Sequence, residues 1–199
     1  PGHEEIELAL YRMYRTTGEK RLLDLCAHFL ERRGQPDNPE AQIFLAAHYA
    51  QSHAPIRDQH EAFGHSVRAM YLYTAMADLA HETGDEALLT AGRDLFLDAT
   101  RRKMYVTGGL GSTSIGESFT VPYDLPNDQA YTETCAGIGL CFFAAAMQEY
   151  EAAVIVGQQT SGKGYFQTTI HLDDGSAVAL SVGKYYTPGG VSLADVGIT

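Results

Sequence analysis

The chain has 199 residues, of which 45% are hydrophobic, and its formal net charge is −11. This length can bury one sizeable core or two small ones, and the composition is that of a globular protein rather than a disordered one. The acidic balance argues against a nucleic-acid partner, which needs a basic face for the phosphates. The absence of any run of about 18 apolar residues argues against a membrane partner.

Cysteine usage bears on the compartment. Three cysteines in a mainly helical pattern do not indicate a disulfide framework, which favours an even count in a short secreted domain. The first residues, PGHEEIELAL, lack the basic end and the apolar run of a signal peptide. We therefore expect a reducing, cytoplasmic location.

Apolar residues at helical spacing predict a pair of helices near the start of the chain, over residues 3–17 and 19–33. Each predicted helix ends at a glycine, which is the usual stop signal. The polar stretch 35–40 then breaks the pattern, and residues 41–60 form a less regular connector.

The connector contains three histidines, His48, His53 and His60. Their spacings of five and seven residues do not match a compact pair of ligands on one helix face. We expect ordinary loop histidines here, with a metal centre as the less favoured alternative.

A second pair of helices is predicted over residues 61–83 and 85–100, again separated by a glycine. Repeated helical hairpins of this length are typical of an α/α toroid, in which an inner ring of helices is buried on both flanks. The loops at one end of such a ring build the pocket. About 140 residues can supply only part of the ring.

The stretch from Gly108 to Cys135 carries the residues with the most chemistry. Glu117 follows a glycine- and serine-rich turn, and Glu133 and Cys135 lie two residues apart where an apolar run begins. Paired carboxylates suit glycosidic bond cleavage, because one group protonates the leaving oxygen while the other stabilises or attacks the sugar carbon. A thiol beside a carboxylate also suits zinc, although residues i and i+2 share a ligand only from an extended segment or a helix entrance. The alternative is that these residues have no catalytic or metal-binding role, and are an exposed loop glutamate, a glutamate at a helix start and a buried cysteine.

The same stretch resembles the β-L-arabinofuranosidase family of glycoside hydrolases. The resemblance is carried by Gly-Gly-x-Gly-Ser at 108–112, Gly-Glu at 116–117, Leu-Pro-Asn-Asp at 125–128 and Tyr-x-Glu-Thr-Cys-Ala at 131–136, and it includes segments 64–73 and 102–109. It implies an (α/α)6 toroid, of which residues 1–143 are a part.

The resemblance also implies a retaining hydrolase that acts on an arabinofuranoside-type sugar. It makes Glu117 the general acid/base, His65 a sugar contact, and Glu133 and Cys135 two ligands of a zinc ion. To act as an acid near neutral pH, Glu117 needs a raised pKa, which we expect the charge of Glu133 to supply. The family completes its site with a downstream Cys-Cys pair that this sequence lacks, and Cys141 would face away from Cys135 on a shared helix. We therefore expect weak zinc binding or none, and little turnover.

From about residue 144 the periodicity changes from helical to β. An apolar strand is predicted at 153–156, and two alternating strands flank the turn Asp174-Gly175. This part resembles the C-terminal processing (tail-specific, S41) serine peptidases in AVIVG, in SGKG, in the L-x-D-G-S-A hairpin and in KYYTP.

These peptidases use a Ser-Lys dyad, and the resemblance makes Lys163 the base and Gln167 the residue that orients it. The position of the nucleophile falls on residues 138–140, which contain no serine, and Ser161 is a poor substitute because it lies in the lysine's own loop. A phosphate-binding loop is not favoured either, since Gly164 stands where that motif needs Ser or Thr.

The expected fold is α+β: a partial (α/α)6 toroid of helical hairpins over residues 1–143, then a small β-hairpin segment over 144–199. Three functions stay open. The first is a fragment with a partial arabinofuranosidase site, fused to a fragment of a processing peptidase, with both catalytic sets incomplete and little or no turnover. The second is a peptidase-like activity, or binding of peptide C-termini, centred on Lys163 and Gln167. The third is a non-catalytic module that self-associates through apolar helix faces left open by the incomplete toroid, with marginal stability as a further consequence.

Overall fold

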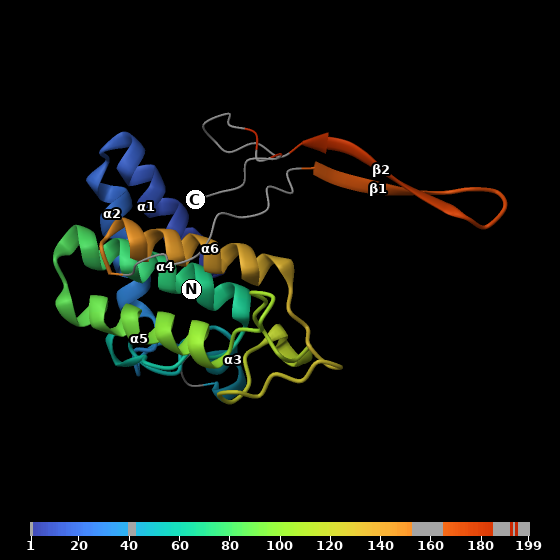
Figure 1. Ribbon diagram of the computed structural model, residues 1–199. Coiled ribbons are helices and arrows are strands. Elements are labelled where there is room, and N and C mark those ends of the chain that lie inside the picture. The colour runs from blue at the N-terminus through green and yellow to red at the C-terminus, as the bar shows by residue number, and fades with distance from the viewer. Residues whose placement is uncertain (1, 40–42, 153–164, 185–191, 193, 195–199) are drawn as a thin grey trace. The chain divides into compact units, whose positions relative to one another are not determined.

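The computed structural model describes residues 2–39, 43–152, 165–184, 192 and 194. The chain divides into two compact units, Pro1–Val154 and Ile155–Thr199. Each unit is described by itself below. Together, the helices of the first and the antiparallel hairpin of the second agree with the predicted α+β class (Figure 1).

Helices dominate the first unit. They are α1 (Glu5–Thr17), α2 (Lys20–Arg32), α3 (Phe44–Tyr49), α4 (Ser66–Thr83), α5 (Glu86–Arg102) and α6 (Thr134–Glu149), with short 3-10 turns η2 (Ile56–Asp58) and η3 (Ile115–Glu117). The pairs α1–α2 and α4–α5 confirm the two predicted helical hairpins. Gly18 and Gly84 end α1 and α4 in the left-handed conformation, and their backbone N–H groups donate to carbonyls of the last turn.

Helix α4 begins later than the sequence pattern predicts. Gly64 has φ +73°, and a Cβ built on it would lie 1.9 Å from the carbonyl oxygen of His48, so the chain turns sharply against the connector. The helix starts only after His65, whose Nδ1 accepts hydrogen bonds from the backbone N–H groups of Val67 and Arg68. The residues before Ser66 therefore belong to the loop.

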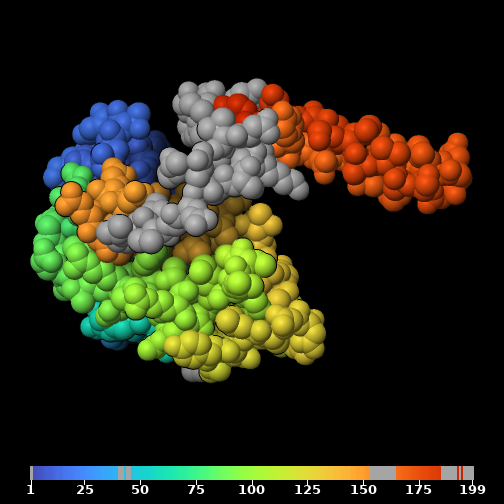
Figure 2. Space-filling view, in the orientation of Figure 1, coloured from blue at the N-terminus to red at the C-terminus, as the bar shows by residue number. Residues whose placement is uncertain are grey.

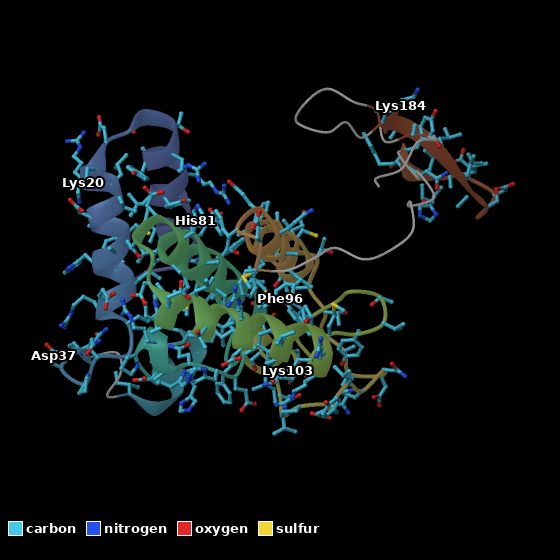
Figure 3. The ribbon with its side chains drawn as sticks, turned by 60° about the vertical axis from the view of Figure 1, so that its left-hand side comes forward. Lys20, Asp37, His81, Phe96, Lys103 and Lys184 are labelled. Carbon is cyan, nitrogen blue, oxygen red and sulfur yellow. The ribbon has the colours of Figure 1, made fainter. Side chains whose placement is uncertain are left out.

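Helix α4 is the centre of the core, packed against α1, α5 and α6. Its side chains are buried on nearly every face, with Met70, Leu72 and Tyr73 among the largest. Helix α6 approaches it closely, because a Cβ at Gly139 would lie 2.7 Å from the Cβ of Met70. Phe96 of α5 meets Phe143 of α6 edge to face, with ring centroids 5.2 Å apart (Figure 3).

A buried ion network ties the start of α1 to the end of α2. The Arg33 guanidinium donates to Glu4 at 2.8 Å, to Glu7 at 2.9 Å and to the carbonyl of Ala50 at 2.8 Å, and all three charged side chains are fully buried. Removing one partner of such a network leaves an unpaired buried charge, which costs about 3–5 kcal/mol.

Between α5 and α6 the chain forms a long loop on the surface of the first unit, drawn in yellow in Figure 2. Three short antiparallel bridges hold this loop: Met104 with Leu110, Thr113 with Ser118, and Ser118 with His65. The last of these brings the loop to the start of α4. The sequence motifs of the loop are thereby placed beside His65.

In the second unit the structure describes an antiparallel hairpin of β1 (Tyr165–His171) and β2 (Ala177–Lys184). Its turn contains Gly175 at φ +84°, as the Asp-Gly signal predicts. The predicted strand at 153–156 lies outside the described residues. Among the described residues, no helix has the length and apolar character needed to cross a membrane.

The predicted boundary at residues 143–144 falls inside α6, and the first compact unit continues to Val154. Phe143, Ala146 and Met147 are all buried in the core of that unit. The helix is therefore continuous across the position where the sequence pattern changes.

Candidate active site

The site begins with the imidazole of His65 at the N-cap of α4. Its Nδ1 accepts from two backbone N–H groups, at 3.2 Å and 3.4 Å, and so carries no hydrogen. The hydrogen of the neutral ring is then on Nε2, which donates to Oε2 of Glu117 at 2.7 Å. The helix cap thus fixes both the tautomer and the direction of the ring.

Glu117 lies at the end of η3 in a conformation that is rare for a residue with a side chain, with φ +51°. Its carbonyl oxygen accepts from Ser66 Oγ at 3.1 Å, and the next two residues are bonded to the start of α4. Strained backbone held by its surroundings is frequent at functional sites, because it aims a side chain at a fixed point. Here it aims the carboxylate at His65.

The second oxygen of Glu117 accepts from the hydroxyl of Tyr131 at 2.8 Å. Each oxygen of the Glu117 carboxylate therefore accepts one hydrogen bond, Oε2 from His65 and Oε1 from Tyr131. The sequence motif contains Tyr131, but nothing in its spacing marked it as a partner of Glu117. The contact arises because Thr132 donates its N–H to the carbonyl of Gly111 at 2.9 Å, which folds the two ends of the loop together.

The Tyr131 hydroxyl, followed by the His65 ring, lowers the pKa of Glu117 by hydrogen-bonding to its charged form. The expectation that Glu133 raises this pKa is wrong for this chain. The Glu117 side chain is 41% exposed, so burial does little to oppose the two donors. Glu117 consequently rests as a carboxylate.

A second part of the site lies at the entrance of α6. Glu133 is the N-cap residue of this helix and Cys135 lies in its first turn, as a shared ligand at i and i+2 requires. The thiol of Cys135 donates a hydrogen bond to the carboxylate of Glu133, which raises the pKa of that thiol. Cys141, also exposed, lines a surface hollow of about 330 Å³ together with Glu133 and the Gly108-Gly109 turn.

The donor set can be compared with the needs of a zinc ion. Zinc takes four protein ligands in structural sites, or three and a water in catalytic ones. Among the described residues, no three His, Cys, Asp or Glu side chains are grouped closely enough to hold a metal ion. Glu133 and Cys135 supply two donors, which do not fit a complete zinc site.

The His65 ring contacts the ring of Tyr49, which in turn contacts the guanidinium of Arg68. The Tyr49 ring meets the His65 ring edge to face at 5.1 Å, and the Arg68 guanidinium lies 5.0 Å from the centre of the Tyr49 ring. Arg68 is ion-paired to buried Glu4 at 2.7 Å. The position of His65 is thus linked to α1 and α3 as well as to α4.

The predicted peptidase residues lie in the second half of the chain. Lys163 is outside the described residues. Gln167 lies on β1, and its Nε2 donates to Ser181 Oγ on β2 at 3.4 Å, within the same hairpin.

Comparisons with known proteins divide the chain in two. Residues 1–155 match the model of the β-L-arabinofuranosidase GH127 catalytic domain, and residues 141–199 match the model of peptidase family S41. The first match includes every residue of the candidate active site. The two matches overlap within and just beyond α6.

Two relatives repeat this division. A non-reducing end β-L-arabinofuranosidase of Bifidobacterium longum subsp. longum is 42% identical over 164 residues, which is 75% of this chain and 25% of the relative. A carboxy-terminal-processing protease of Bartonella bacilliformis is 45% identical over 56 residues, covering 28% of this chain and 13% of the relative.

Among solved structures, a GH127 β-L-arabinofuranosidase from Geobacillus stearothermophilus T6 is 47% identical, with a TM-score of 0.71 over 75% of this chain and 26% of that one. A second GH127 β-arabinofuranosidase gives a TM-score of 0.67 at 40% identity, over 74% of this chain and 22% of that one. The chain thus spans about a quarter of the length of these relatives.

Proposed function

Because the chain belongs to the GH127 β-L-arabinofuranosidase catalytic-domain family through residues 1–155, we propose that it carries the acid/base half of a retaining arabinofuranosidase site. Glu117 is the acid/base, and His65 contacts an arabinofuranoside-type sugar. The observation that supports this most is the Glu117 carboxylate between the His65 ring and the Tyr131 hydroxyl. The chain has about a quarter of its relatives' length, so we propose little or no turnover by this chain alone.

In a retaining reaction, Glu117 first protonates the leaving oxygen and later takes a proton from the attacking water. The two hydrogen bonds to its carboxylate favour the second role. For the first role the carboxyl must gain a proton, which a bound sugar assists by excluding water from the exposed side. In the family, the nucleophile is one cysteine of the downstream Cys-Cys pair. This sequence has only Cys141 after Cys135, so it lacks that pair and the nucleophile has to come from elsewhere.

We propose weak zinc binding or none at Glu133 and Cys135. Zinc binds the thiolate, so it has to displace the thiol hydrogen that Cys135 shares with Glu133. Zinc stoichiometry, measured on the purified chain and on Cys135→Ala, tests this. One tightly bound zinc that is lost in Cys135→Ala would contradict it and would require a third ligand.

The helices of the first unit are proposed to be part of an (α/α)6 toroid. Two helical hairpins with a central helix suit such a ring, and the likeness to the longer GH127 structures supports it. Ile138 and Phe142 on α6 are 48% and 44% exposed. Apolar side chains on the outer face of a helix are expected where the next helix of the ring is absent.

A sugar titration followed by NMR of the histidine ring signals tests the proposed active site. The probe is L-arabinose, and the chain carries isotope-labelled histidine. We expect the His65 signal to shift with a dissociation constant in the millimolar range, as for a small polar ligand. In Glu117→Gln, any slow release of arabinose from an aryl β-L-arabinofuranoside should be abolished. A His65 signal that does not respond to the sugar would overturn the proposal.

The peptidase alternative rests on the match of residues 141–199 to peptidase family S41. Of its two predicted residues, Gln167 bonds to Ser181 within the hairpin, and Lys163 lies outside the described residues. The peptidase activity stays a prediction. It is checked by incubating the chain with a peptide and testing by mass spectrometry whether the C-terminus of the peptide is cleaved.

A further inference from the structure

A second hollow lies against the connector between α2 and α4, and it shares no lining residue with the Glu117 site. Its volume is about 530 Å³, within the range of about 300–1,000 Å³ that is usual for small-molecule pockets. Its lining includes the three histidines singled out in the sequence, together with Gln59, Phe63 and Arg102. No role in the proposed hydrolase site involves these residues.

Three rings form an aromatic wall in this hollow. The rings of His48 and His53 are stacked, with centroids 5.6 Å apart and planes inclined by 14°, and Phe63 meets them at 4.9 Å and 5.6 Å. The positions of Phe63 and His48 relative to each other are fixed, because Gly64, which follows Phe63, packs directly against the backbone of His48. Flat aromatic surfaces of this kind pack well against the C–H face of a ring-shaped ligand.

Polar groups flank the wall. The Gln59 side chain is 1% exposed and donates from Nε2 to the carbonyls of Gln51 and Ala54, each at 2.7 Å. Its Oε1 has no hydrogen-bond partner among the described residues. A buried acceptor left in this state is costly unless a water or ligand donates to it.

Two of the charged groups at the rim are paired with residues of α5 and its C-cap, whereas the exposed Asp58, which also lines the hollow, has no ion pair among the described residues. His60 Nδ1 lies 2.8 Å from Asp94 Oδ2, and Glu61 accepts from Lys103 Nζ at 2.8 Å. Lys103 is labelled at the end of α5 in Figure 3. The rim therefore combines paired polar atoms with one further carboxylate, Asp58, which can accept hydrogen bonds from ligand hydroxyls.

We infer that this hollow is a second binding site, for a neutral, hydroxyl-rich ring of the monosaccharide class. An aromatic wall, an amide and paired polar groups suit a ligand whose hydroxyls both donate and accept. A metal ion fits less well, since no three ligand side chains are grouped among the described residues. The inference is independent of the proposed catalysis at Glu117.

The test uses the full chain with labelled histidine and three probes in separate titrations: L-arabinose, D-glucose and Zn²⁺ alone. We expect at least one of the sugars to shift the His48 and His53 signals saturably, in the millimolar range. His53→Ala removes part of the wall at an exposed position, and we expect it to weaken binding about tenfold. His28→Ala is the matched control, because it removes an exposed histidine beside another phenylalanine, Phe29, at 6.0 Å.

The outcomes separate this site from the proposed active site. Sugar-induced shifts of His48 that persist in Glu117→Gln and in His28→Ala, but weaken in His53→Ala, support the inference. The inference is overturned if neither sugar moves the His48 and His53 signals, if His28→Ala weakens binding equally, or if only Zn²⁺ moves them. A sugar response at His65 alone would support the proposed function and contradict the inferred second binding site.

Discussion

At the scale of single residues, Glu117 shows how partners distant in sequence decide the chemistry of a side chain. His65 reaches it from 52 residues earlier and Tyr131 from 14 residues later. Both donate to the carboxylate, so its native-state pKa is lower than in the unfolded chain. The stabilisation from these bonds is therefore present above the unfolded pKa and is lost as the pH falls through the native-state pKa.

Tyr131→Phe removes the larger of the two effects, so we expect the pKa of Glu117 to rise towards the ordinary glutamate value. Carboxyl ¹³C signals followed by NMR between acid and neutral pH measure it. Tyr14→Phe is a matched control, because it removes a similar hydroxyl–carboxylate bond, to Glu82 at 2.6 Å, from another part of the unit. An unchanged Glu117 titration in Tyr131→Phe would show that the hydroxyl does not set this pKa.

Sequence reasoning singled out Glu117, His65, Glu133 and Cys135 because each stands in a local motif, and their roles stay predictions. It failed on the direction of the Glu117 pKa. That property depends on Tyr131, whose hydroxyl reaches the carboxylate only after the loop has closed through the Thr132 to Gly111 hydrogen bond. Closure of this kind is a tertiary event that residue spacing does not encode.

At the scale of elements, helix ends followed the sequence where a glycine marks them, as at Gly18 and Gly84. The pairs α1–α2 and α4–α5 were predictable for that reason. The start of α4 was not, because the cap is a histidine and the turn before it is set by contact with His48. How the helices pair was not predictable either, since helix α6 meets α4 through Gly139, a position without an apolar side chain.

The packing of α4 also buries an acid. Asp78 is fully buried, and burial raises its pKa from 3.8 to about 6, although it accepts from the Tyr150 hydroxyl at 2.6 Å. A raised native-state pKa means that its stabilising contribution is present below about pH 4 and is lost as the pH rises through about 6.

We expect Asp78→Asn to gain free energy of unfolding relative to the parent chain as the pH rises from 4 to 7, by up to about 3 kcal/mol. Asparagine keeps an acceptor for Tyr150 and has no charge to desolvate. Urea unfolding at several pH values measures the difference, with exposed Asp24→Asn as the control. A difference that does not vary with pH would contradict the buried charge.

At the scale of the whole molecule, the chain is a piece of each family that it matches. The first unit has a well-formed core around α4, yet it leaves Ile138 and Phe142 exposed on α6. Ile138 and Phe142 lie four residues apart, so they share one face of α6 and can form part of an interface.

We expect the chain to self-associate in a concentration-dependent way, and Phe142→Lys to shift it towards monomer. Sedimentation velocity over a range of concentrations measures this. Leu25→Lys is the control, since Leu25 is an apolar residue on α2 whose exposed fraction, 41%, is close to the 44% of Phe142. A parent chain that stays monomeric throughout would count against an open helix face as an association surface.

The two family matches overlap in helix α6, which is continuous from Thr134 to Glu149. Phe143, Ala146 and Met147 reach the core from both sides of the predicted boundary. A helix turns by about 100° per residue, so one residue added or lost at that boundary would rotate everything after it out of phase. An insertion or deletion at this boundary is therefore constrained by the helical phase that Phe143, Ala146 and Met147 need to reach the core.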